Sequence, residues 1–284
     1  MRVHLVPSPQ SWPEMGGVRQ HCRLLRAHIT KWVEVVDDPR VFTHVQSAYP
    51  SPRCDVWTCH GGFTPPIPQI QVNLWRSTRI ISVARWIVDE FFPDERRPCT
   101  VVIPNGVDLS EWDISSPEQG FVLTKAYNAR IRDWSLFCTA VAHLPDLEVI
   151  SLGAPLEGKV PSNVRVLSPL EYSRYQKLLS SCSVYVSCSL EVCPTMVLEA
   201  WAARRPVLAL GVRGNRELLG REFRECLYED ASELEVKLRE LISSDSLRVQ
   251  LGERGREYVE AHHNWEELAK ATADVYASTQ GIAR

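Results

Sequence analysis

The chain has 284 residues, of which 44% are hydrophobic and 24% are charged, and its formal net charge at pH 7 is −3. This length fits two domains better than one, and the composition excludes a disordered chain or a collagen-like fibre. The sequence has no run of 18 apolar residues, so no membrane-spanning helix is expected, and the slight negative charge argues against a protein that coats nucleic acid. The apolar stretch before Pro7 is too short for a secretory signal, so we expect a cytoplasmic protein.

The cysteine pattern indicates free thiols. The nine cysteines are an odd number, and no two of them have the C-x-x-C spacing of zinc or redox sites. The densest cluster is Cys54, Cys59 and His60, and it lacks such a pair. We therefore expect the cysteines to serve as small apolar groups in a reducing compartment.

The first residues predict the strand, glycine loop and helix that open a doubly wound α/β domain. Val3 and Leu5 alternate with polar residues and predict a short strand that ends at Pro7. A loop closes with Gly16 and Gly17, and a helix follows. Its apolar face, at spacings of four, three and four, is Val18, Cys22, Leu25 and Ile29, and its opposite face is Arg19, Arg23 and Arg26.

Short β-rich runs continue through the first hundred residues and predict a compact domain. Strands are expected at Trp32–Val36, Val41–Val45, Asp55–Cys59, Arg79–Val83 and Thr100–Ile103. Between them lie a proline-rich loop at 61–68 and a short helix near 84–92. The turn-forming residues of 104–108 end this domain, which therefore spans residues 1–108.

A second cycle of strands and helices follows Gly120. Strands are expected at 121–124, 148–152, 164–167, 184–187 and 207–210, and helices at 133–143, 172–180, 195–203, 233–243, 247–261 and 265–277. The alternation predicts a parallel sheet with right-handed crossovers, and hence a second Rossmann-like domain at 109–262. We expect the final segment, 263–284, to pack back toward the first domain, and ligands to bind in a cleft between the two domains at the carboxyl ends of the strands.

Two glutamates in the stretch 187–210 suggest a ligand site. Glu191 falls in the loop after a predicted strand, and Glu199 lies about one turn inside the helix that follows. Pro194 suits the first turn of that helix and Thr195 suits the cap. Carboxylates at such positions can accept hydrogen bonds from the hydroxyls of a sugar or a ribose. The first backbone amides of the helix, those of Thr195, Met196 and Val197, suit a diphosphate.

This segment resembles the E-x7-E signature of retaining glycosyltransferases of family 4, which have the GT-B fold of two Rossmann-like domains facing a cleft. The resemblance covers most of the chain. Four of its other motifs are Gly16-Gly17, a D-V-x-x-x-H strand end at 55–60, a linker I-P-N-G-V-D at 103–108 and a G-G-x-x-E turn at 214–217. A fifth, His263-Asn264-Trp265, resembles the F-S-W before the terminal helix. The five occur in the family's order.

The resemblance implies a role for each candidate residue. It places Glu191 on the hydroxyls of the donor sugar and Glu199 on the ribose of the nucleotide. It places Lys125, with Arg130 or Arg132, on the diphosphate. The backbone of Gly16 and Gly17 would approach a phosphate. His60 would contact the sugar or help to transfer a proton. The donor would be a UDP-, GDP- or ADP-sugar, no metal would be obligatory and no cofactor is expected.

Two departures from the family pattern bear on this interpretation. Arg204 stands where the family usually has glycine, and the first domain is shorter than in the family. The alternatives left open are a sugar-nucleotide epimerase of the same architecture and a non-catalytic sugar-nucleotide-binding module.

Charge is the only guide to the acceptor. Residues 1–108 contain 12 Lys and Arg against 10 Asp and Glu, whereas residues 109–284 contain 20 against 25. The slight basic excess of the first domain, together with the stripe Arg19, Arg23 and Arg26, favours an anionic acceptor such as a lipid surface, a phosphorylated sugar or a modified nucleic acid. The rival interpretation of the stripe is a solvated helix face, and no partner protein is implied.

Overall fold

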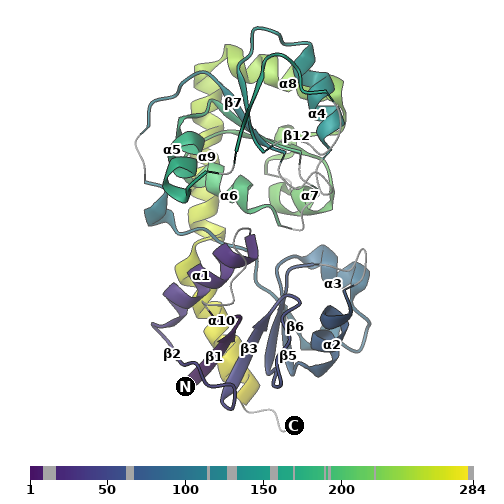
Figure 1. Cartoon of the computed structure of the whole chain (residues 1–284), viewed down its shortest axis with the longest axis vertical. Helices are drawn as coiled ribbons and strands as arrows, with labels where there is room; N and C mark the ends of the chain where they lie inside the picture. The colour runs from purple at the N-terminus through teal and green to yellow at the C-terminus, as the bar shows by residue number, and fades with distance from the viewer. Residues whose placement is uncertain are drawn as a thin grey trace. The chain divides into compact units, whose positions relative to one another are not determined.

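The structure, a computed structural model, describes residues 1–8, 17–61, 67–113, 116–126, 133–153, 159–168, 170–188, 190, 193–220 and 222–280. Four candidate residues, Gly16, Arg130, Arg132 and Glu191, lie outside the described residues. The chain divides into two compact units. Unit 1 comprises Met1–Asp108 and His263–Arg284, and unit 2 comprises Leu109–His262 (Figure 1).

Unit 1 is built on a six-stranded sheet in which all strand pairs are parallel. The strands are β1 (Arg2–Val6), β2 (Glu34–Val35), β3 (Phe42–Gln46), β4 (Val56–Cys59), β5 (Arg79–Ser82) and β6 (Thr100–Val102), in the spatial order β2-β1-β3-β4-β5-β6. Each predicted strand of this domain is present. The order reverses between β1 and β3, which is where such sheets bind ligands.

Four helices accompany this sheet: α1 (Gly17–Ile29), α2 (Pro68–Arg76), α3 (Arg85–Phe91) and α10 (Trp265–Gln280). Helix α2 was not predicted, because Pro68 stands at the end of a proline-rich stretch that is typical of a loop. Pro68 occupies the first turn of the helix, where its missing N–H costs no intrahelical hydrogen bond. The predicted face of α1 is largely confirmed, since Cys22, Leu25 and Ile29 are buried and Val18 is half-buried.

The terminal helix α10 supplies part of the core of unit 1. Trp265, Leu268, Val275 and Tyr276 join one buried cluster with residues of α1, β1, β3, β4 and β5. Figure 1 shows α10 (yellow) beside α1 and the sheet. The burial of so many apolar side chains is the main stabilising contribution at this junction.

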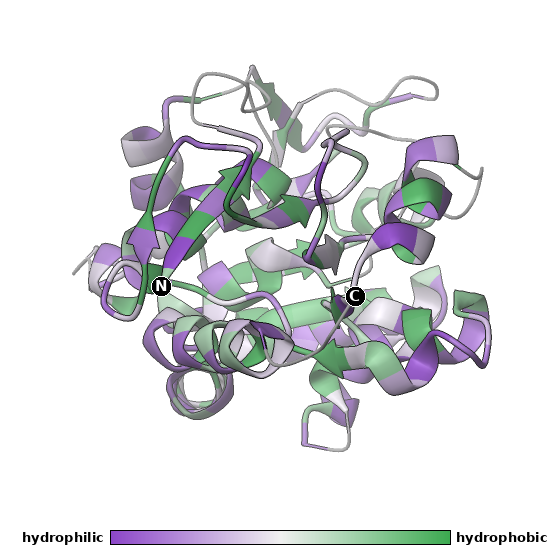
Figure 2. Ribbon diagram, turned by 90° about the horizontal axis from the view of Figure 1, so that it is seen from below, coloured by the Kyte–Doolittle hydropathy of each residue, from purple (hydrophilic) through white to green (hydrophobic). Residues whose placement is uncertain are grey.

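Unit 2 also has a six-stranded parallel sheet. Its strands are β7 (Val122–Lys125), β8 (Val149–Leu152), β9 (Val164–Leu167), β10 (Val184–Ser187), β11 (Val207–Leu210) and β12 (Leu227–Tyr228), and its helices are α4 (Trp134–Ala142), α5 (Tyr172–Ser181), α6 (Thr195–Ala202), α7 (Arg213–Leu219), α8 (Ala231–Ser243) and α9 (Asp245–His262). Short 3-10 turns occupy Arg97–Cys99 in unit 1, and Leu109–Glu111 and Arg224–Cys226 in unit 2. Strands β7, β10 and β11 are rich in apolar residues, and Figure 2 shows hydrophobic residues (green) along the strands. The strand order β12-β11-β10-β7-β8-β9 is that of a Rossmann fold.

Two features of unit 2 differ from the prediction. The stretch 214–217, expected as a turn, lies inside α7, where Asn215 donates a hydrogen bond to the carbonyl of Leu210. Strand β12 was missed because its two residues are too few to show a period. Arg204, the residue that departs from the expected motif, has a φ of +56°, in the left-handed region that glycine adopts most readily, and its carbonyl lies so close to Gly252 that a Cβ on Gly252 would meet it at 2.2 Å.

Buried histidines make unit 1 sensitive to acid. Burial lowers the pKa of His21 to about 4 and that of His44 to about 3, so both are neutral in the folded chain. The unfolded chain binds protons on these groups near its ordinary pKa of about 6.5. Stability is therefore fully present above that pH and declines as the pH falls toward the folded values, by up to about 1.4 kcal/mol per pH unit for each histidine.

We predict that the urea midpoint of the chain falls between pH 7 and pH 5, and that His44→Gln reduces this fall. The matched control is His143→Gln, because His143 is exposed, and it should leave the pH dependence as it is. If the urea midpoint of His44→Gln falls between pH 7 and pH 5 as much as that of the unaltered chain, His44 does not cause the acid sensitivity.

Candidate functional site

The sheet of unit 2 brings the ends of β7 and β10 together. The two strands pair in parallel, with Leu123 opposite Tyr185 and Thr124 opposite Val186. The chain order reverses between them, and such a reversal is the place where sheets of this kind bind ligands. Lys125 is the last residue of β7 and lies at this point.

Cys188, the first residue after β10, ties these strand ends to α4. Its carbonyl accepts a hydrogen bond from the backbone amide of Asp133 at 2.9 Å, and its thiol is 3.9 Å from the carbonyl of Lys125. Asp133 in turn caps α4 by accepting from the amide of Leu136 at 3.2 Å. Cys188, which precedes the segment with Glu191, is thus hydrogen-bonded to Lys125 and Asp133, the residues on either side of the segment with Arg130 and Arg132.

Two buried polar groups at this place have no hydrogen-bond partner among the described residues. They are the indole N–H of Trp134, the first residue of α4, and the hydroxyl of Ser187, the last residue of β10. An unsatisfied buried donor costs about 1–3 kcal/mol, and six further buried side-chain atoms elsewhere in the described residues are in the same state. Neither residue was predicted from the sequence.

Glu199 is buried on α6 and is held by a residue that the sequence analysis missed. The hydroxyl of Tyr175 on α5 donates a short hydrogen bond to the Oε2 atom of Glu199. Burial, followed by the charge of Glu199, raises the pKa of Tyr175 well above its usual value, so the phenol keeps its proton. The side chain of Glu199 is therefore fixed by a charge-assisted hydrogen bond from a neighbouring helix.

The start of α6 differs from the prediction in two respects. Pro194 is the N-cap and makes no side-chain cap bond, while Thr195 is the first helical residue rather than the cap. The amide of Val197 already donates to the carbonyl of Pro194 at 3.1 Å, so the expectation of three available amides is wrong for Val197. Thr195 and Met196 remain as the candidate amides.

In unit 1, His60 directly follows β4 and contacts two polar residues of neighbouring elements. Its Nε2 atom is 3.0 Å from Oε1 of Gln46 on β3, and its ring lies edge-on to that of His21 on α1 with centroids 4.5 Å apart. Burial, and then His21 and His44, lower the pKa of His60 well below its ordinary value. Gly17 begins α1, at the helix N-terminus that follows β1.

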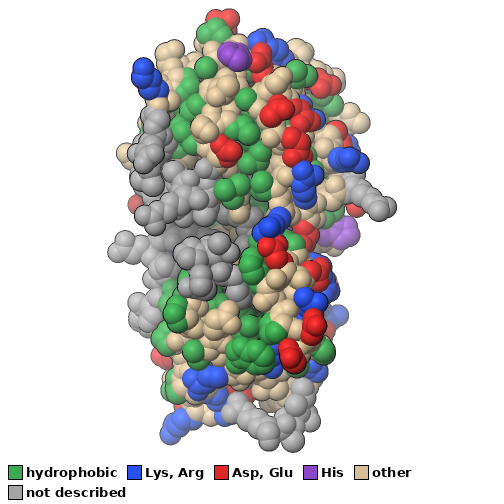
Figure 3. Space-filling model, turned by 90° about the vertical axis from the view of Figure 1, so that its right-hand side faces the viewer, with side chains coloured by type: hydrophobic (Ala, Val, Ile, Leu, Met, Phe, Trp, Pro, Cys, Tyr) green, Lys and Arg blue, Asp and Glu red, His purple; other side chains and the backbone are tan. Residues whose placement is uncertain are grey.

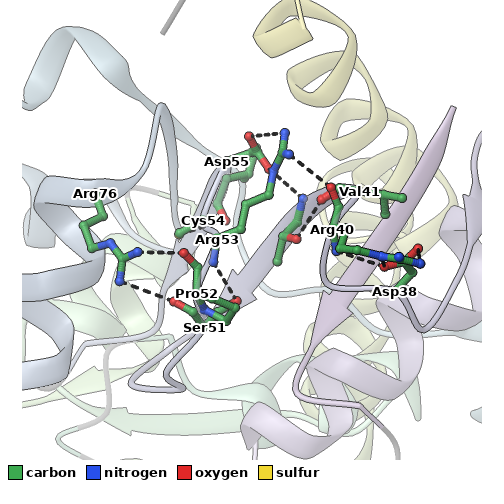
Figure 4. A network of polar contacts seen from close by, with 11 residues as sticks. Asp38, Arg40, Val41, Ser51, Pro52, Arg53, Cys54, Asp55 and Arg76 are labelled. Atoms are coloured by element: carbon green, nitrogen blue, oxygen red, sulfur yellow. Dashed lines mark hydrogen bonds and ion pairs between the residues drawn. The ribbon is translucent and has the colours of Figure 1, made fainter.

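Asp55, at the other end of the same motif, serves the fold. Its carboxylate accepts hydrogen bonds from Nε and Nη2 of Arg53, at 2.5 and 3.1 Å, and from the backbone amide of Thr43 at 2.7 Å (Figure 4). A cavity of about 360 Å³ lies beside this ion pair at the amino ends of the strands. The motif D-V-x-x-x-H thus combines a structural aspartate and a histidine at opposite ends of β4.

The arginine stripe of α1 is partly accessible. Arg19 is exposed, Arg23 and Arg26 are half-buried, and Arg23 donates to Gln20 at 3.1 Å. On the face that Figure 3 shows, acidic and basic side chains are interspersed, so that face carries no large field of one sign.

The nine cysteines are free, and six of them are buried. Burial raises the pKa of Cys22, Cys59, Cys182 and Cys226 to about 12, so these thiols stay protonated. Within the described ranges, no group of three or more His, Cys, Asp or Glu side chains could hold a metal ion. No helix in the described part of the chain is both long and apolar enough to cross a membrane.

Two Rossmann-like units, each with a parallel sheet, define the class: the structure has the GT-B fold of glycosyltransferases. It superposes with a TM-score of 0.77 on a sucrose-phosphate synthase from Thermosynechococcus elongatus, at 15% identity over 99% of this chain and 100% of that one. Anabaena HepE in complex with UDP-glucose gives 0.75 at 14% identity, over 98% and 99% of the two chains. WaaG, a glycosyltransferase involved in lipopolysaccharide biosynthesis, gives 0.67 at 14% identity, over 97% and 99%.

The model of the family described as "Glycosyl transferase-like" matches residues 130–274, just over half of the chain. The chain therefore belongs to the glycosyl transferase-like family.

We predict that Tyr175→Phe destabilises the chain by about 1.5–3 kcal/mol, because the substitution leaves the buried Glu199 carboxylate without this donor. Tyr228→Phe is the matched control: it removes a neutral hydrogen bond of 3.2 Å to the carbonyl of Ser187 and should cost only about 0.5–1.5 kcal/mol. Urea denaturation measures both. Equal losses would mean that the Tyr175 bond carries no charge assistance.

Proposed function

We propose that this chain transfers a sugar from a nucleoside diphosphate donor to an acceptor hydroxyl, with retention of configuration at the anomeric carbon. Family membership and the GT-B fold support the sugar transfer. HepE, which has this fold, is described in complex with UDP-glucose, and this supports a nucleotide-sugar donor for the present chain.

The observation that supports the proposal is the set of polar residues on the elements that begin or end beside β7 and β10. Lys125 supplies a cation there, Trp134 and Ser187 supply buried groups without partners among the described residues, and Glu199 supplies a fixed carboxylate on the next helix. A nucleoside diphosphate needs a cation and N–H donors for its phosphates and an acceptor for its ribose hydroxyls. The proposal assigns these chemistries to the switch point of the sheet, where Rossmann folds bind ligands.

In this proposal the residues divide the donor among them. Glu191 accepts from the hydroxyls of the sugar, and Glu199 accepts from those of the ribose. The diphosphate is bound by Lys125, by Arg130 or Arg132, by the amides of Thr195 and Met196, and by the backbone at Gly16 and Gly17. His60 contacts the sugar or receives a proton.

The reaction needs no enzymic nucleophile. The acceptor hydroxyl attacks the anomeric carbon on the face from which the diphosphate departs, and a phosphate oxygen of the leaving group takes the acceptor's proton. The protein contributes by stabilising the negative charge that develops on the diphosphate. No metal is obligatory in this scheme, because Lys125 and the arginines supply the positive charge.

For the acceptor, we propose an anionic molecule bound through Arg19, Arg23 and Arg26. The support is their position on α1, which begins at Gly17, and the slight basic excess of residues 1–108. The contribution of such partly exposed cations should fall as salt screens them.

Glu191→Ala tests the transfer chemistry. We expect turnover to fall by about 10²-fold, equivalent to about 2.7 kcal/mol, with little change in nucleotide affinity, because the lost contacts form in the transition state. Steady-state kinetics with the donor that gives the largest thermal shift among UDP-, GDP- and ADP-glucose measures this. A ligand at 100 times its Kd stabilises by about 2.7 kcal/mol, which such a panel detects.

Glu257→Gln, an exposed position on α9, is the control and should keep full turnover. Near-normal turnover of Glu191→Ala would refute the role of Glu191. Donor binding without transfer or donor hydrolysis in the unaltered chain would favour the binding module, and interconversion of the donor sugar would favour the epimerase.

Lys125→Ala tests the diphosphate site. We expect calorimetry to show a larger loss of affinity for the nucleoside diphosphate than for the nucleoside, because the missing charge faces phosphate. Lys177→Ala on α5, where the side chain is exposed, should change neither affinity. Equal losses for the two ligands would mean that Lys125 acts only through the fold.

A further inference from the structure

A chain of buried polar side chains leads from α10 through the sheet of unit 1 to His60. His44 on β3 places its Nδ1 atom 2.6 Å from the hydroxyl of Tyr276 on α10. Its Nε2 atom lies 2.6 Å from the hydroxyl of Thr58 and 3.1 Å from Nε2 of Gln46. The Oε1 atom of Gln46 then meets Nε2 of His60 at 3.0 Å.

Strand alternation explains why these groups meet. His44 and Gln46 are two residues apart on β3 and share a face of the sheet. Gln46 pairs in register with Thr58 of β4, and His60 follows Thr58 by two residues on the same face. Four of these residues are almost fully buried: His44, Gln46, Thr58 and Tyr276. A polar group without a hydrogen-bond partner would cost free energy at such positions.

The amide of Gln46 gives this chain a direction. An amide NH2 only donates and an amide oxygen only accepts. Nε2 of His44 must therefore be unprotonated to receive the amide N–H, which leaves its proton on Nδ1, donated to Tyr276. Nε2 of His60 must carry a proton to donate to the amide oxygen. The two histidines are thus held as opposite tautomers.

We propose that Gln46 is a positioning residue that fixes His60 as its Nε2–H tautomer and leaves its Nδ1 atom as the acceptor. Among the described residues, no hydrogen-bond partner lies at Nδ1 of His60. That atom can receive a hydrogen bond or a proton but cannot donate one. The consequence for catalysis rests on the proposed function, whereas the tautomer does not.

The titratable groups that face His60 come from two elements. They are His21 on α1 and His44 on β3, and both are neutral near pH 7 because burial lowers their pKa values. A charge introduced at position 46 would therefore act on His60 without an opposing ionised group among these neighbours.

The test is the tautomer state of the histidines in the full chain labelled with 15N-histidine, read from long-range proton–nitrogen NMR spectra at neutral pH. His60→Gln and His44→Gln assign the signals. We expect His60 to show a protonated Nε2 and an unprotonated Nδ1, and His44 to show the reverse. The opposite pair of tautomers, or the same tautomer at both residues, would overturn the proposal.

Gln46→Glu keeps the size of the side chain and removes its donor. A carboxylate accepts from both rings, so His44 should change to its Nε2–H tautomer while His60 keeps its own. The titration midpoint of His60 should also rise by about one pH unit or more, because the new charge favours the imidazolium. An unchanged His44 tautomer together with an unchanged His60 midpoint would contradict the proposal.

Gln46→Met removes the polar groups at nearly constant volume and should leave His60 as a mixture of tautomers. Thr58→Val is the matched control, because Thr58 contacts His44 and not His60. It should leave the His60 tautomer unchanged. A single His60 tautomer that persists in Gln46→Met would show that Gln46 does not fix it.

The pH dependence of turnover separates this proposal from the proposed function. In Gln46→Glu the acidic limb of kcat should move to higher pH by the shift that NMR measures for His60. If NMR finds the expected tautomers but His60→Gln retains full turnover, the assigned role of His60 fails and the role of Gln46 stands. If turnover depends on His60 but substitution of Gln46 does not change the His60 tautomer, the assigned role of His60 stands and the role of Gln46 fails.

Discussion

The fold of unit 1 depends on a contact between two distant segments, the turn at 105–107 and the residues at 263–265. The amide of Val107 donates to the carbonyl of His263 at 2.9 Å, and the His263 ring bonds to the carbonyl of Asn105 at 2.8 Å. Gly106 permits this approach, because a Cβ there would lie 2.6 Å from Leu268 and 2.8 Å from the carbonyl of His263. The chain leaves unit 1 and returns to it at this contact, so the sheet gains α10 only if the contact forms.

The sequence predicted the two sheets well because their central strands are buried parallel strands, which appear as short runs rich in apolar residues between turn formers. The whole of β10 and β11, for example, is buried. What the sequence did not show is α2, whose start at Pro68 was hidden in a proline-rich stretch, and the helical state of 214–217. In both places a proline or a glycine, which usually indicates a turn, lies instead in the first turn of a helix.

The candidate site was predicted to a different extent in its two units. In unit 2, spacing gave Glu199 as a candidate and the family resemblance added Lys125; the structure places them on α6 and at the end of β7, and their roles stay predictions. Spacing did not identify Tyr175, since its contact with Glu199 joins two helices whose separation is set by packing. In unit 1, the alternation of His44 with Gln46 and of Thr58 with His60 was visible, but only the register of β3 against β4 shows that the four groups meet.

The polar chain of unit 1 connects the return of the terminal helix to the surroundings of His60. Tyr276 is the acceptor for His44, and it reaches the sheet only because α10 is anchored by residues 263–265. Without Tyr276, the Nδ1–H of His44 would be a buried donor with no acceptor, and the tautomer that receives the Gln46 amide would lose its advantage. The same helix places Trp265 against the ring of His21, with centroids 4.9 Å apart, and His21 contacts His60. The docking of α10 and the protonation state of His60 are therefore coupled through direct contacts.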